Sequence, residues 1–67
     1  MLEYKLTIWF TETHKLEVYI NDRNISNVAV LASVKSSPWI ETSIGEAVYV
    51  DWEKVILASL MPAEFLE

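Results

Sequence analysis

Hydrophobic and polar residues alternate along the first twenty positions of the chain. Even-numbered positions are apolar from Leu2 to Thr11, and the alternation resumes from Lys15 to Ile20. A period of two is typical of a strand that buries one face. The pattern predicts two antiparallel strands joined by a loop at Glu12–His14.

With that loop, every inward side chain of the hairpin pairs with another inward side chain, which is the condition that fixes a register. The predicted inward pairs are Phe10 with Leu16, Ile8 with Val18 and Leu6 with Ile20. Asn21–Asn24 follows as a turn, because its side chains bond their own backbone readily.

The stretch Asn27–Lys35 fits two kinds of element. Read at period two, its alternate positions form one apolar row, and valine, serine and asparagine are poor helix formers. These features predict a strand. A helix over about 25–36 remains the alternative, since Asn24 or Ser26 can cap its first turn.

The second half of the chain contains three further apolar segments. They predict strands at 39–44, 47–51 and 55–61. Gly45 marks a hairpin turn, for which a two-residue loop (Gly45–Glu46) and a three-residue loop (Gly45–Ala47) both remain open. Asp51–Lys54 has the length of one tight helical turn.

Five to six short strands separated by frequent turns predict an all-β fold, either a small antiparallel barrel or a strongly bent sheet. One tight helical turn is expected near Asp51–Lys54. The alternative is an α+β fold, ββαββ, with a helix at about 25–36.

The segment 15–60 resembles the small SH3-like and Sm-like barrels in layout. The likeness depends on the runs LEVYI, VAVLASV and WIETSIGEAVYVDWEKVI. In those barrels a glycine-containing hairpin leads to a V-x-V strand, one tight helical turn and a short closing strand, and GEAVYVDWEKVI is similar. The resemblance implies architecture alone, because the residues with which Sm-like proteins hold RNA have no counterpart. The ββαββ alternative is similar to many short bacterial and phage proteins.

The 67 residues are expected to form one domain over 1–65, with Leu66–Glu67 interpreted as a tag remnant. A domain of about 60 residues buries only ~60% of its unfolded surface, so it needs additional stabilisation. There is no cysteine for a disulfide and one histidine, His14, which disfavours a metal site. With 52% hydrophobic residues, association is the remaining route, and we expect a homo-oligomer or a protein partner.

Ten acidic and five basic residues give a net charge of −5. Proteins that bind nucleic acid or anionic membranes usually present a basic face, so neither is an expected partner. No apolar run approaches the ~20 residues of a membrane span, and a cytoplasmic location is expected.

The sequence predicts no catalytic, cofactor-binding or metal-binding residue. His14 lies in a short loop without an orienting partner, and Asp51 and Glu53 diverge around one tight turn. A single glycine excludes a phosphate-cradling loop. We therefore expect that the protein is not an enzyme.

The candidate interface lies on the outward face of the first hairpin. Trp9 and Tyr19 have outward parity, and the predicted register places them opposite Glu17 and Thr7, with the two rings diagonal to each other. Tryptophan and tyrosine are enriched at binding hot spots. The interface candidates are Trp9, Tyr19, Thr7, Glu17 and Trp52. Trp52 and Trp39 are expected in the core or at its rim.

Three functions follow from these features. The first is a non-enzymatic interaction module that self-associates through this face or through an unpaired strand edge. The second is an acidic inhibitor that mimics nucleic acid, with a path of carboxylates at Glu3, Glu12, Glu17, Glu41, Glu46 and Asp51. The third is a nucleic-acid-binding barrel, which the charge disfavours.

Overall fold

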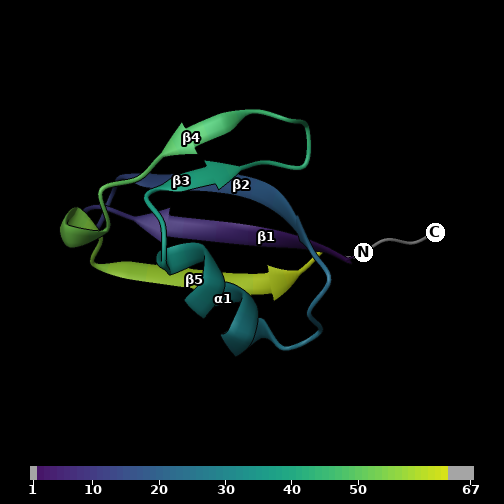
Figure 1. Cartoon of the computed structure of the whole chain (residues 1–67). Coiled ribbons are helices and arrows are strands. Elements are labelled where there is room, and N and C mark those ends of the chain that lie inside the picture. Colours follow the sequence, from purple (N-terminus) through teal and green to yellow (C-terminus); the bar gives the residue numbers. More distant parts are fainter. Residues whose placement is uncertain (1, 64–67) are drawn as a thin grey trace.

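The computed structural model describes residues 2–63 and contains five strands, one α-helix and one 3-10 turn (Figure 1). In chain order they are β1 (Leu2–Trp9), β2 (Lys15–Asp22), α1 (Asn27–Lys35), β3 (Trp39–Glu41), β4 (Ala47–Tyr49), η1 (Trp52–Lys54) and β5 (Leu57–Pro62). The interpretation of Leu66–Glu67 as a tag remnant lies outside the described residues.

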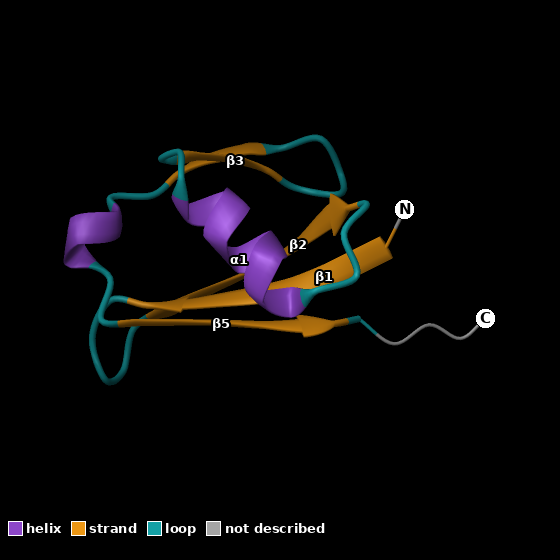
Figure 2. Cartoon of the chain, turned by 60° about the horizontal axis from the view of Figure 1, so that its bottom comes forward, coloured by secondary structure: helices purple, strands orange, loops and turns teal. Residues whose placement is uncertain are grey.

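The strands form two antiparallel sheets, and over residues 2–63 they do not close into a barrel. One sheet has the order β2-β1-β5, and the other is the β3–β4 hairpin. Figure 2 shows α1 and the β3–β4 hairpin on the same side of the three-stranded sheet. The backbone N–H of Ser43, in the hairpin loop, donates to the carbonyl of Tyr19 on β2 at 2.7 Å. The mostly β, bent-sheet architecture predicted from the sequence is confirmed.

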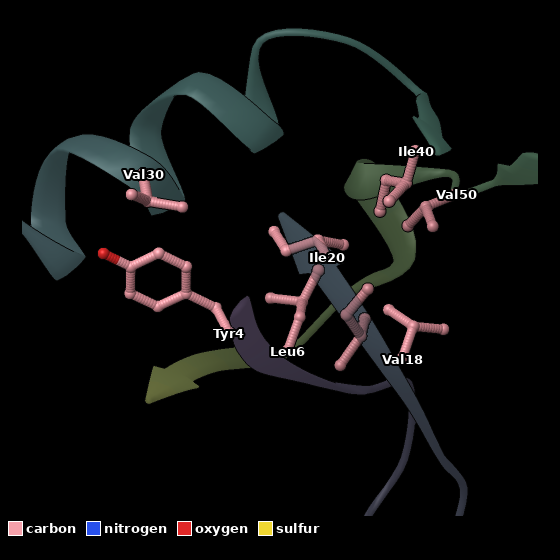
Figure 3. Close-up of a cluster of buried hydrophobic side chains, with 8 residues drawn as sticks. Tyr4, Leu6, Val18, Ile20, Val30, Ile40 and Val50 are labelled. Atoms are coloured by element: carbon pink, nitrogen blue, oxygen red, sulfur yellow. The ribbon is translucent and has the colours of Figure 1, made fainter. Parts of the chain in front are cut away.

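The core lies between these layers. The even-numbered side chains of β1 from Tyr4 to Ile8 and of β2 from Leu16 to Ile20 point into it, as their alternation predicts, and meet side chains from α1 and the hairpin segment (Figure 3). The buried residues are Tyr4, Leu6, Ile8, Val18, Ile20, Val30, Ile40 and Val50. The hydroxyl of Tyr4 donates to the carbonyl of Asn24, which attaches the loop before α1 to the sheet.

The predicted register of the first hairpin is wrong by two residues. Leu16 pairs with Ile8 rather than with Phe10, because the loop is wider than three residues. Its backbone closes by a bond from Phe10 N–H to the His14 carbonyl at 2.9 Å, and the Thr11 hydroxyl accepts from the His14 N–H at 3.0 Å. A shift of two preserves parity, so the same side chains still face the core.

The strand predicted over 27–35 is wrong, and the helical alternative describes this segment. Ser26 is the N-cap, and its hydroxyl accepts from the Ala29 N–H at 3.3 Å. Val30 is fully buried against the sheet. Capping and tertiary burial outweigh the weak helix propensities of the segment.

Both registers considered for the Gly45 hairpin are also wrong. Ile40 pairs with Val48, and the loop is closed by a bond from Thr42 N–H to the Glu46 carbonyl at 2.8 Å. Gly45 therefore ends the loop instead of beginning it. Its φ of +88° is a left-handed conformation that glycine adopts without steric cost.

The tight helical turn is confirmed as η1, capped by Asp51, whose side chain accepts from the Glu53 N–H at 3.2 Å. The last strand begins two residues later than predicted, at Leu57. It pairs with β1 and leaves Pro62 at its end.

Candidate interaction surface

The odd-numbered side chains of β2, β1 and β5 share one surface of the three-stranded sheet, which we call the outer face. Across the three strands they form the rows Lys15–Trp9–Leu57, Glu17–Thr7–Ser59 and Tyr19–Lys5–Met61, followed by Asn21 and Glu3. α1 and the β3–β4 hairpin lie on the opposite side, so no element within residues 2–63 covers this face (Figure 2).

Trp9 is held at one end of the outer face by its neighbours on both sides. The Nζ atom of Lys15 lies 5.0 Å from the Trp9 ring centroid, and Leu57 lies opposite Trp9 on β5. Trp9 is half-buried, whereas Leu57 is 57% exposed. Together they form an apolar cluster at this end of the outer face.

Tyr19 and Met61 lie farther along the sheet, one on each side of Lys5. They are 45% and 59% exposed. The predicted pairing of Trp9 with Glu17 and of Thr7 with Tyr19 is wrong, because the wider loop shifts the register. The two aromatic rings therefore lie in separate rows, with the row that contains Thr7 and Glu17 between them.

The charges on the outer face balance. Its charged side chains are Glu3, Lys5, Lys15 and Glu17, two of each sign. The Glu17 carboxylate lies 3.3 Å from the Lys15 Nζ and 3.6 Å from the Lys5 Nζ. The hydrogen bond and charge of Lys15, followed by the charge of Lys5, lower the pKa of Glu17 below its ordinary value.

A hollow of about 270 Å³ adjoins the outer face where β2 meets the β3–β4 loop. It is lined by Glu3, Glu17, Tyr19 and Glu46, together with loop residues that include Ser43. The Ser43 hydroxyl donates to the Glu3 carboxylate at 3.0 Å. Over residues 2–63, no group of three or more histidine, cysteine or acidic side chains is placed to hold a metal ion.

His14 is exposed in the first hairpin loop. Its Nδ1 lies 3.0 Å from the Thr11 hydroxyl and 3.2 Å from the Thr13 hydroxyl. These contacts are confined to the loop and contribute to its closure.

The two remaining tryptophans lie away from the outer face. Trp52 is half-buried against the core, and its indole N–H donates to the Ser37 carbonyl at 2.8 Å. Trp39 was expected in the core or at its rim but is 61% exposed. It stacks edge-on against Tyr49, with ring centroids 5.2 Å apart, on the outward side of the β3–β4 hairpin.

Sequence reasoning missed Leu57 and Met61 as members of the outer face. Their odd parity with Ser59 was visible in the sequence, but it assigns a face only once the pairing of β5 with β1 is known. That pairing joins the two ends of the described chain, and no short-range pattern indicates it.

Comparisons with protein-family models, with curated proteins and with solved structures found no match. Among the described residues, no helix has the length and apolar character needed to cross a membrane.

Proposed function

We propose that this protein is a non-enzymatic interaction module that binds a second copy of itself through the outer face of the β2-β1-β5 sheet. One observation carries the proposal: Trp9, Leu57, Tyr19 and Met61 lie on a sheet face over which no helix or strand of residues 2–63 packs. Aromatic residues and methionine are the types enriched in the centres of protein interfaces.

The organisation of Trp9 favours binding. Lys15 and Leu57 already restrict its ring in the free chain, so little side-chain freedom is lost when a partner covers it. Removal of the exposed Leu57 and Met61 side chains from water then stabilises the complex by the hydrophobic effect.

Charge favours a second copy as the occupant. Two molecules of net charge −5 repel each other over most of their surfaces. On the outer face the two lysines balance the two glutamates, so copies meet there without net repulsion. The Trp39–Tyr49 pair is a poorer candidate, because its strands carry Glu41 and no basic residue.

The arrangement supports the acidic-mimic function less well. Glu17 is paired with two lysines, Asp51 caps η1, and Glu12 lies in the loop at the far end of the first hairpin. A nucleic-acid mimic needs a continuous path of unpaired carboxylates.

The test is sedimentation equilibrium of Trp9→Ser, with Trp39→Ser as the matched control. Both variants replace one tryptophan by serine, and only the first alters the outer face. We expect Trp9→Ser to raise the dissociation constant about tenfold or more, which is a loss of roughly 1.4 kcal/mol. Trp39→Ser should leave the constant unchanged, and equal effects of the two variants would contradict the proposal.

A further inference from the structure

We infer that two copies join edge to edge through β5, in an antiparallel two-fold pairing centred on Ser59. The result is one continuous six-stranded sheet, β2-β1-β5 followed by β5-β1-β2 of the second copy. The inference rests on the proposed self-association and adds to the outer-face contact a second contact between copies, through the β5 edge.

β5 is an edge strand that packs against α1 but has no strand on its outer side within residues 2–63. The strand order places it at one end of the sheet. Proteins usually block such edges with charges, bulges or proline, yet Leu57–Pro62 contains no charge and carries its proline at the last position. An uncharged edge also lets two acidic chains approach each other.

The opposite edge of the sheet is better protected. β2 carries Lys15, Glu17 and Asp22, and the Tyr19 carbonyl is already bonded to the Ser43 N–H. β5 is therefore the edge that is available to a second copy.

The backbone of β5 selects one register. The Ala63 N–H donates to the Glu3 carbonyl at 2.9 Å, so the odd-numbered residues of β5 bond to β1. The even-numbered residues, Ala58 and Leu60, then direct their N–H and C=O groups to the outer edge.

Only one register of a two-fold pairing lets both Ala58 and Leu60 form backbone hydrogen bonds with the second copy. Ala58 lies opposite Leu60 of the second copy, and each residue donates and accepts one bond. A shift that pairs Ala58 with Pro62 loses bonds, because proline has no N–H. A shift in the opposite direction pairs Leu60 with Ile56 of the second copy. The Ile56 N–H is not free for that pairing, because it already donates to the Trp9 carbonyl at 2.9 Å.

This register also matches side chains on the outer face. Leu57 lies opposite Met61 of the second copy, and the reciprocal pair forms across the two-fold axis. The Leu57 and Met61 side chains of the two copies then form one continuous apolar strip across the β5–β5 junction.

Interface size gives an independent reason for edge pairing. The outer face of one copy has only three strands, of eight, eight and six residues, whereas a standard interface buries ~800 Å² of accessible surface per partner. Joining two copies at β5 doubles the continuous outer face that a further layer can cover.

The test introduces one cysteine into a chain that has none. Ser59 pairs with itself at a non-hydrogen-bonded position, where Cα atoms lie about 4.5 Å apart, a separation compatible with a disulfide. We expect Ser59→Cys to form a covalent dimer under mild oxidation. Leu57→Cys, on the same strand and face, should form none alone but should cross-link when mixed with Met61→Cys.

A second variant, Ala58→Pro, removes an N–H that points away from β1, so the fold is kept and the junction is lost. We expect a sedimentation mass below that of the unmodified chain at the same concentration, with an unchanged circular dichroism spectrum. An associating protein in which Ser59→Cys does not cross-link and Ala58→Pro has no effect overturns the β5 junction. If Trp9→Ser still weakens that association, the outer-face proposal survives. If instead Ser59→Cys cross-links and Ala58→Pro lowers the mass while Trp9→Ser has no effect, the outer-face proposal is overturned and the β5 junction is retained.

Discussion

Trp9 lies opposite Leu57 in the antiparallel pairing of β1 with β5. The first and last strands of the described chain therefore create this part of the outer face together. The surface exists only when β5 is docked, because neither the first hairpin nor β5 alone contains both side chains. Association and folding are consequently coupled, and variants that loosen β5 should weaken both.

The Tyr4 hydroxyl tests how the sheet holds the loop before α1. Tyr4→Phe removes the donor to the Asn24 carbonyl and leaves the packed ring in place. We expect the free energy of unfolding to fall by about 1 kcal/mol, the usual net value of one hydrogen bond. Urea denaturation measures it, and Tyr49→Phe, at an exposed ring, should be near neutral.

The cap of α1 tests why a segment rich in valine is helical. Ser26→Ala removes the acceptor of the Ala29 N–H, and caps of this kind contribute about 1 kcal/mol. Ser33→Ala, at an exposed position inside α1, should leave the free energy of unfolding unchanged or slightly raised. Thermal unfolding measures the stability of both variants. An equal loss of stability in Ser26→Ala and Ser33→Ala would contradict the capping role of Ser26.

The hairpin loop tests the left-handed backbone of Gly45. A Cβ at this position meets no atom within 4 Å, so Gly45→Ala changes only the backbone energy at φ +88°. We expect a loss of about 1–2 kcal/mol in the free energy of unfolding. Gly45→Asn should lose less, because asparagine tolerates this region, and a larger loss for Asn would refute the explanation.

The ion pairs of the outer face predict a pH dependence. The pKa of Glu17 is lowered in the folded chain, first by Lys15. The stabilisation that the charged Glu17 gives the folded chain is therefore complete above its unfolded pKa of about 4.3. It is lost as pH falls through the lower pKa of the folded state. In an NMR titration we expect Lys15→Met to raise the pKa of Glu17 more than Lys5→Met does. The reverse order would show that the Lys15 contact is not the main cause.

Local patterns predicted the faces of the first hairpin but not its register. The alternation places Leu6 and Ile8 in the core whatever the loop length, because a shift of two residues preserves parity. The loop width depends on bonds of Thr11 and His14 that composition does not specify. The pairing of Trp9 with Lys15 was missed for that reason.

Long-range packing decided the remaining elements. The segment 27–35 has the composition of a strand, but burial of Val30 against the sheet and the Ser26 cap make it a helix. The outer face was only half predictable, since Leu57 and Met61 join it through a pairing that spans the described chain.

The most direct test of self-association is the mass of the unmodified chain measured by sedimentation equilibrium over a wide range of concentrations. Self-association predicts a mass that rises with concentration from 7.7 kDa to at least about twice that value. A mass that stays at 7.7 kDa up to millimolar protein would contradict it.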